Sequence, residues 1–300
     1  MSIYNIFLVR QSMAFETRKE IEVKYGFVIP GGDVLEHLEI AQEIEAAGWD
    51  GVFVADMVYG TDPWVSLAAI AALTKRVRLG TLLTPVSRRR PWKLASETAT
   101  LDRLSEGRVV LAVGLGAIDT GFDKVGEATD RKVRAQLLDE GLDVITRFWS
   151  GKPFSYHGKH YNVEWGTDWT YTPVQSPRIP IWVVGAWPRE ASVRRAARYD
   201  GVLASKMSES GGFSEPTPDD IREIKAFVAK ERSEAGLETQ TALDIVVEGV
   251  TPGNDPAKAK SILEPLAEAG ATWWIESMWM VPGGMEAVRN RIAQGPPQIG

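Results

Sequence analysis

Small residues follow several apolar, strand-like runs in this chain, and such residues leave the backbone open to a ligand. The stretch LDRLSEGRVVLAVGLGA ends in Gly114-Leu115-Gly116-Ala117 after one such run. Glycine has no Cβ, so the backbone can approach a bound molecule closely at these positions. A tight turn between a strand and a helix needs the same glycines, so the two glycines alone leave both interpretations open. The next glycine, Gly121, does not have the spacing of a dinucleotide-binding fingerprint.

A second segment of small residues could bind a phosphate. Gly185-Ala186-Trp187 ends an apolar run and is followed by Pro188 and a helical pattern, and proline is favoured in the first turn of a helix. Free N–H groups at a helix start, together with the helix dipole, favour bound anions. The alternative is a simple helix start without a ligand.

Carboxylates at the ends of apolar runs are the candidates for proton transfer. Asp56 directly follows the run Gly51-Ala55 and is the best candidate for a catalytic residue; a carboxylate that caps the next turn is the alternative. Glu248 and Glu276 could act as acid and nucleophile of a glycoside hydrolase. His157 and His160 resemble a metal-ligand pair only superficially, so we predict no metal site.

An alternation of strands and helices must position these residues. Eight apolar runs predict strands, most of them buried on both faces. They are Tyr25-Ile29, Gly51-Ala55, Val77-Leu83, Val109-Val113, Ile181-Val184, Gly201-Ala204, Leu243-Glu248 and Thr272-Glu276. The helical runs between them are Val34-Ala47, Trp64-Thr74, Trp92-Leu104, Arg131-Trp149, Glu190-Arg198, Asp219-Glu234, Pro256-Ala269 and Met285-Ala293. Eight strand–helix units in 300 residues predict an α/β fold. The expected architecture is a (β/α)8 TIM barrel that forms a single domain over residues 1–300.

One segment does not fit the alternation. Residues 152–180, after the fourth helix, contain PFSYHGKHYNV, in which His157-Gly158-Lys159 predicts a hairpin turn. We expect this segment to be an insertion on the catalytic rim of the barrel.

Composition excludes several classes of partner. The net charge is -6, and the only basic block is Ser87-Arg88-Arg89-Arg90, which argues against nucleic acid. The apolar stretch Ile3-Val9 is too short for a signal-peptide core, and no run reaches the length of a membrane span. We therefore expect a cytoplasmic protein that acts on a small molecule, without a membrane partner.

Together, four segments resemble the luciferase-like monooxygenase family, which includes hydride transferases that use the deazaflavin coenzyme F420. The strongest match is RRPWKLASETATLDRLSEGRVVLAVGLG, residues 89–116. It is supported by KYGFVIP, by AQEIEAAGWDGVFVAD and by RIPIWVVGAWPREASVRRAARYDGV. The resemblance implies FMN or coenzyme F420 as cofactor and a small organic substrate at the carboxyl ends of the strands. It also implies that a separate reductase could supply reduced cofactor and that two chains could pair through their first two helices.

The resemblance assigns site residues as well. It implies a non-proline cis peptide or bulge at Thr81-Leu82, behind the central ring of the cofactor. The implied cofactor contacts are Asp56, Thr81, Leu82, Gly114, Gly116, Gly185, Ala186 and Trp187. The expected apolar substrate wall consists of Met57, Trp165, Trp169 and Trp279.

The chain departs from the resembling dehydrogenases at two positions. The sugar and alcohol dehydrogenases of that family carry His directly after the acidic residue and Glu shortly after the fourth-strand glycines, where this chain has Met57 and Ala117. Neither side chain can transfer a proton, which argues against alcohol oxidation by that route. We predict hydride transfer to an activated double bond, or monooxygenation. A flavin-binding relative without turnover and the glycoside hydrolase are the alternatives.

Overall fold

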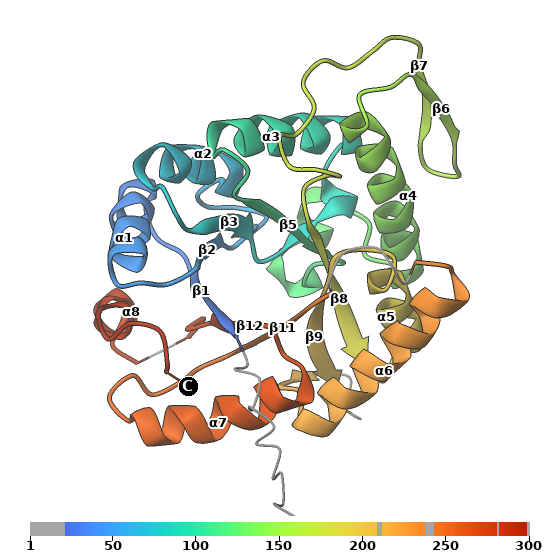
Figure 1. The fold of residues 1–300 in the computed structure, drawn as a ribbon. Coiled ribbons are helices and arrows are strands. Elements are labelled where there is room, and N and C mark those ends of the chain that lie inside the picture. Colours follow the sequence, from blue (N-terminus) through green and yellow to red (C-terminus); the bar gives the residue numbers. More distant parts are fainter. Residues whose placement is uncertain (1–21, 209–211, 238–242, 281, 299–300) are drawn as a thin grey trace, which may run out of the picture.

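A closed barrel of eight parallel strands forms the centre of the molecule. The computed structural model describes residues 22–208, 212–237, 243–280 and 282–298 (Figure 1). The barrel strands are β1 (Lys24–Ile29), β2 (Gly51–Val54), β3 (Arg78–Thr81), β5 (Val109–Gly114), β8 (Ile181–Trp187), β9 (Gly201–Met207), β11 (Asp244–Gly249) and β12 (Trp273–Glu276). Each strand pairs in parallel with the next in this order, and β12 pairs with β1 to close the ring. The predicted TIM barrel is confirmed.

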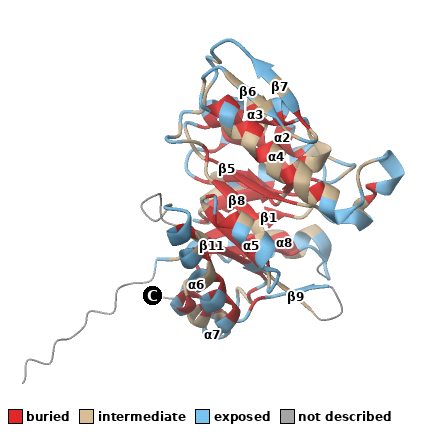
Figure 2. Cartoon of the chain, turned by 90° about the vertical axis from the view of Figure 1, so that its right-hand side faces the viewer, coloured by how far each residue is buried: buried red, intermediate tan, exposed pale blue. Residues whose placement is uncertain are grey.

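Helices surround the barrel, as predicted. They are α1 (Val34–Ala46), α2 (Pro63–Leu73), α3 (Pro91–Leu104), α4 (Arg131–Trp149), α5 (Glu190–Ala196), α6 (Pro218–Glu234), α7 (Pro256–Ala269) and α8 (Gly284–Ala293). Two short strands add to the sheet: β4 (Thr84–Pro85) extends alongside β5, and β10 (Phe213–Ser214) lies antiparallel to β9. The central barrel strands are mostly buried, whereas the helices expose one face (Figure 2). The stretch Ile3-Val9 lies outside the described residues. No helix in the described ranges is long and apolar enough to cross a membrane.

Side-chain caps fix where helices begin above the carboxyl ends of the strands. Asp33 caps α1 by accepting the N–H of Leu35, while the Glu36 carboxylate accepts the N–H of Asp33. Asp62 caps α2 by accepting the N–H groups of Trp64 and Val65, and Pro63 occupies the first turn of this helix. Such caps typically contribute about 1 kcal/mol each, so the loops at this edge of the barrel are held firmly.

The insertion lies outside the barrel, not on its catalytic rim. It forms the antiparallel hairpin β6 (Phe154–His157) and β7 (Asn162–Trp165), which packs along the outer surface of α4 (Figure 1). The Glu140 carboxylate in α4 accepts the N–H groups of Lys159 and His160 at 3.0 and 2.8 Å. A connection from a helix to the next strand starts and ends at the amino-terminal edge of the sheet, opposite the active edge. The expected position of residues 152–180 was therefore wrong.

Aromatic side chains fill the amino-terminal half of the barrel. The rings of Phe53, Trp182 and Trp273 contact one another, with centroids 5.2 Å apart for the two tryptophans and 5.6 Å for Phe53 and Trp182. Glycines provide the room: a Cβ on Gly201 would lie 2.3 Å from the Trp182 ring, and one on Gly26 would lie 2.7 Å from Phe53. Because this half is packed solid, a ligand can enter the barrel only from the carboxyl edge, here called the mouth.

A half-buried carboxylate that is hydrogen-bonded to one of these rings makes the stability of the protein depend on pH. Asp244 accepts hydrogen bonds from Trp182 Nε1 at 3.2 Å and Thr272 Oγ1 at 3.0 Å, yet burial raises its pKa. The folded state thus binds this proton more tightly than the unfolded chain does, and stability falls as pH rises from the unfolded pKa through the folded one. Asp244→Asn is expected to be more stable than the parent at neutral pH. The difference should vanish at about pH 3, where both states of the parent carry the proton; urea unfolding across this range measures it.

Candidate functional site

The alternation of side chains along each barrel strand determines which residues face the mouth. Val246 and Ile275 belong to the inner cluster of the barrel, whereas Val247 and Trp274 belong to the outer layer under the helices. Because successive side chains on a strand point to opposite faces, every second residue counted from these inner residues also points into the barrel, up to the carboxyl edge. The inward positions there are Pro30, Ala55, Leu82, Gly114, Ala186, Ser205, Glu248 and Ser277. In these positions only Glu248 carries a charge, so the mouth is mostly small and apolar.

Gly114 at the end of β5 and Gly116 just after it lack a side chain because other side chains of the protein occupy the space beside them. A Cβ on Gly114 would lie 2.9 Å from Val184 Cγ2 and 3.0 Å from Leu83 Cδ2. Gly116 has φ +75°, and its Cβ would lie 2.8 Å from the ring of Phe122. The turn interpretation accounts for Gly116. Gly114 instead lets Leu83 and Val184 meet at the floor of the mouth, which gives a planar ligand an apolar surface.

The segment after β8 offers fewer free amides than the sequence predicts. The Ala186 N–H donates to Ser192 Oγ at 2.9 Å, and the Arg189 N–H donates to the Ala186 carbonyl at 2.7 Å. A Cβ on Gly185 would lie 2.5 Å from Val202 Cγ1, so this glycine serves packing. The Trp187 indole points to the helical layer, where its Nε1 donates to the Glu223 carboxylate of α6 at 2.8 Å. Helix α5 begins only at Glu190, two residues beyond Pro188.

The cis peptide lies one position later than predicted. It joins Leu82 and Leu83, whereas the prediction placed it at Thr81-Leu82. The Thr81 hydroxyl is fully buried and hydrogen-bonds to the Thr84 hydroxyl at 2.8 Å. Thr81 therefore turns away from the mouth, and Leu82 and Leu83 are the residues of this segment that pack on the inner cluster.

Asp56 is held in an ion-pair cluster. Its side chain is 1% exposed and accepts Nε and Nη2 of Arg89 at 3.0 and 2.9 Å, together with Nη2 of Arg88 at 3.1 Å. Arg88 also donates to the Asp56 carbonyl at 2.7 Å. These charge-assisted bonds fix the loop after β2 to the segment after β4. Asp56 thus joins these two segments and does not cap the next helix, where Asp62 is the capping residue. Its catalytic role stays a prediction.

Arg134 is a rim residue that the sequence analysis missed. It is 4% exposed and donates through Nη1 to the carbonyls of Leu115 and Gly116 at 2.8 and 3.0 Å. Burial lowers its pKa. No carboxylate of the described residues pairs with it, and its buried Nε has no hydrogen-bond partner. The sequence does contain one signal for it: Arg134 is a cation on the apolar face of the predicted helix, one turn before Leu138.

The guanidinium groups of Arg88 and Arg134 both lie close to the Phe122 ring. The two guanidinium carbons are 5.2 and 5.5 Å from the ring centroid, and Phe122 is fully buried. The Nε atom of Arg88 is also buried and without a partner. Unpaired buried donors carry a desolvation cost of about 1–3 kcal/mol each, more when charged, and an anionic ligand would relieve it.

Glu276 does not face the mouth. It is fully buried in the outer layer, where it accepts the N–H and hydroxyl of Thr251, both at 2.7 Å. Trp274 Nε1 and Arg291 Nη2 also donate to it, at 3.1 and 3.3 Å. The glycoside-hydrolase alternative needs two carboxylates that face one substrate, and the structure does not place Glu276 beside Glu248 in the mouth.

The predicted substrate wall divides into two pairs. Met57 and Trp279 follow β2 and β12 at the carboxyl edge and are 42% and 41% exposed, so both can border the mouth. Trp165 and Trp169 instead pack against Phe148 near the end of α4, with centroids 5.4 and 4.5 Å from its ring. The pair from the insertion thus stabilises the hairpin.

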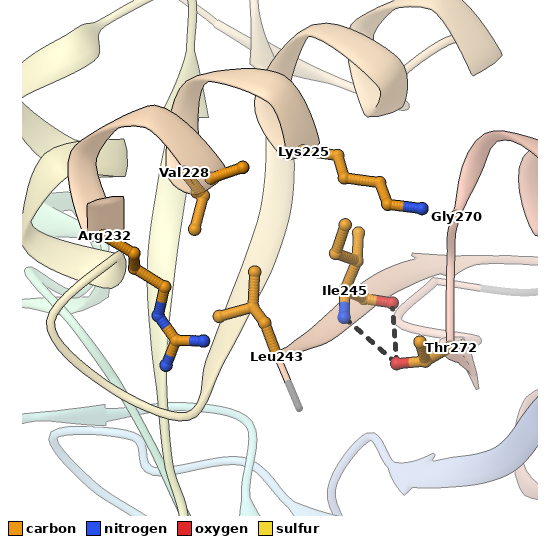
Figure 3. A pocket seen from close by; sticks show the side chains of 8 residues that line it. Lys225, Val228, Arg232, Leu243, Ile245, Gly270 and Thr272 are labelled. Carbon is orange, nitrogen blue, oxygen red and sulfur yellow. Dashed lines mark hydrogen bonds between the residues drawn. The ribbon is translucent and has the colours of Figure 1, made fainter. Parts of the chain in front are cut away.

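A pocket of about 430 Å³ lies away from the mouth (Figure 3). Its lining comes from α6 and from the residues just before and within the amino-terminal ends of β11 and β12: Lys225, Val228, Ala229, Arg232, Leu243, Ile245, Gly270 and Thr272. The Arg232 guanidinium donates to the carbonyls of Ala197 and Tyr199, so it is used to anchor α6. Chemistry on this fold takes place at the opposite edge. No group of three or more His, Asp or Glu residues in the described ranges could hold a metal.

Comparisons with known proteins show the family and agree with the barrel fold. An uncharacterized protein of Mycobacterium tuberculosis is 35% identical over 145 residues, which are 48% of this chain and 50% of the relative. An F420-dependent glucose-6-phosphate dehydrogenase of Nakamurella multipartita is 27% identical over 274 residues, 81% of this chain and 79% of the relative. The structure of F420-dependent tetrahydromethanopterin reductase from Methanopyrus kandleri superposes with a TM-score of 0.74 at 18% identity and covers 91% of this chain and 97% of that one. The family model described as luciferase-like monooxygenase matches residues 17–286, and the chain belongs to that family.

Proposed function

We propose that this chain is an oxidoreductase that binds coenzyme F420 or FMN across the mouth and reduces or oxygenates a small organic molecule. The observation that carries the proposal is Arg134, a buried cation with an unpartnered Nε and no paired carboxylate in the described part of the chain. Both cofactors have a flat tricyclic ring and an anionic tail. The apolar floor and the unpaired guanidinium fit these two parts.

Apolar residues and arginines would together hold the cofactor. Leu83, Val184 and Ala186 offer an apolar surface for the ring, while Arg88 and Arg134 would hold the phosphate. The bound cofactor supplies hydride or activates oxygen, and the protein orients the substrate and excludes water. The F420-dependent relative favours the deazaflavin. Because Met57 and Ala117 cannot move protons, reduction of a C=C or C=N bond fits better than alcohol oxidation.

A binding titration with F420 and with FMN tests the proposal. The parent should change the fluorescence of one cofactor in a saturable manner. Arg134→Met should weaken binding about 10- to 100-fold, the value expected for a charge-assisted hydrogen bond worth about 1.5–3 kcal/mol. Arg134→Lys keeps the charge and should lose less.

Arg131→Met is the matched control. Arg131 lies in the same helix but is exposed, so its loss should leave the affinity unchanged. Circular dichroism of each variant separates weakened binding from unfolding. No saturable signal with either cofactor in the folded parent would refute the proposed function.

The proposed assembly is a homodimer through α2. This helix is apolar on both sides: its inner face packs on the barrel, and Val65 and Leu73 on the outside are 67% and 46% exposed. A helix that is apolar all round normally has a partner on each side. A second chain that presents the same face would cover it, in line with the two-fold symmetry usual in dimers. A separate reductase as supplier of reduced cofactor remains part of the proposal.

A further inference from the structure

Glu248 is the acidic side chain that the fold directs into the mouth. It is the fifth residue of β11, two positions after Val246 of the inner cluster, and it is in register with Ile275 of β12, another inner residue. Ile245 and Val247 lie in the outer layer. Because side chains alternate along a strand, Glu248 points into the barrel opening.

The charged side chains at the ends of the two flanking strands, Lys206 and Glu276, are in ion pairs, whereas no ion pair involves Glu248 among the described residues. On the β9 side, Lys206 faces the helical layer and bonds to Asp220 at 2.8 Å. On the β12 side, Glu276 faces the helical layer and pairs with Arg291 at 3.3 Å. No cation of the described residues lies within ion-pair distance of Glu248. Its carboxylate is therefore free to exchange a proton.

The surroundings of Glu248 favour its protonated form. Burial raises the pKa of Glu248, the nearby Glu215 carboxylate raises it further, and a hydrogen bond from the Trp279 side chain lowers it. The residue is nonetheless exposed to solvent. A carboxylic acid that is protonated closer to neutral pH and open to water can donate a proton and recover it.

We propose that Glu248 donates the proton required when a C=C or C=N bond is reduced at the mouth. This inference rests on the proposed function. In the balanced step, one atom of the double bond accepts a hydride from the reduced deazaflavin. The electron pair of the π bond moves to the other atom, which takes the proton from Glu248. The products are the saturated substrate, the oxidised cofactor, the ring proton that the cofactor releases to water, and the Glu248 carboxylate, which regains a proton from water.

The first test follows the Glu248 proton itself. Protein labelled with 13C at the glutamate carboxyl carbons is titrated by NMR, and the resonance missing from Glu248→Gln identifies Glu248. Its midpoint should lie above that of an ordinary glutamate and should move when oxidised F420 is added. Glu215→Gln, which removes the neighbouring negative charge, should lower the midpoint and leave F420 binding intact. A Glu248 midpoint that does not respond to F420 overturns the proposal.

The second test is single-turnover oxidation of reduced F420 with 2-cyclohexen-1-one and with 1-pyrroline as alkene and imine probes. Glu248→Gln should slow turnover at least about 100-fold, in keeping with the loss of a general acid, and leave the F420 affinity within twofold of the parent. The parent rate should fall as pH rises through the Glu248 midpoint, and Glu248→Asp should recover part of the rate.

The two failures can be told apart. An unaltered rate and pH profile in Glu248→Gln, with F420 still bound, overturns the role of Glu248 alone. A parent that binds neither F420 nor FMN overturns the proposed function.

Discussion

Replacing Asp56 with asparagine is expected to lower the free energy of unfolding by about 3–5 kcal/mol, the range for removing one partner of a buried ion pair. The side chain is 1% exposed and is the shared partner of two arginines that are themselves 10% and 20% exposed. Asparagine keeps the shape but removes the carboxylate that Arg88 pairs with and the one that lies nearest to Arg89, which keeps only Asp62 and Glu97 at 4.0 and 3.9 Å. Urea unfolding at neutral pH, followed by tryptophan fluorescence, measures the loss.

Glu97→Gln is the matched control for Asp56. Glu97 approaches the same Arg89 at 3.9 Å, but its side chain is 24% exposed, and no hydrogen bond joins the two groups. Its loss should cost less than about 1 kcal/mol, as for other weak pairs near the surface. If Asp56→Asn instead folds as stably as Glu97→Gln and loses turnover, Asp56 acts in the chemistry, as the sequence first suggested.

The barrel could be predicted because its local signals agree with the global fold. Runs such as Val52-Phe53-Val54 are apolar at every position, as required when a parallel strand is buried on both faces, and helical runs with a clear apolar stripe separate them. Residues 152–180 were predicted at the wrong edge of the barrel because the prediction relied on their aromatic composition. Their tryptophans suggested a ligand wall, but the direction of chain entry from α4 decides the edge on which they lie.

The position of a candidate site residue could be predicted only where the end of a single strand determines it. The carboxyl-edge position of Asp56 follows from β2 alone, but its arginine partners lie 32 and 33 residues further along the chain, so its role depends on tertiary contacts. The same holds for Gly114, whose missing Cβ is explained by Val184 from another strand. Arg134 belongs to no motif, and its position becomes significant only once the structure shows that its side chain lies on the buried face of α4.

Glutamine in place of Glu276 should also destabilise the fold, by about 3–5 kcal/mol. Glu276 is fully buried, and Arg291, which is 5% exposed, has this carboxylate as its ion-pair partner. Arg291 further donates to the carbonyl and hydroxyl of Thr251, so the three residues attach α8 to the ends of β11 and β12. Loss of the charge leaves the buried guanidinium uncompensated, and urea unfolding should show the effect as a lower midpoint.

Glu248→Gln is the matched comparison, because it makes the same chemical change on the adjacent strand with the side chain facing the other way. Burial raises the pKa of Glu248, so at neutral pH its ionised form is disfavoured in the folded state, and the neutral amide should leave stability equal or slightly higher. The two variants should therefore separate cleanly: Glu276→Gln loses stability, while Glu248→Gln keeps stability and loses turnover. If instead Glu276→Gln were fully stable and inactive, the carboxylate would have to reach the mouth, and the acid-and-nucleophile pair of a glycoside hydrolase would regain support.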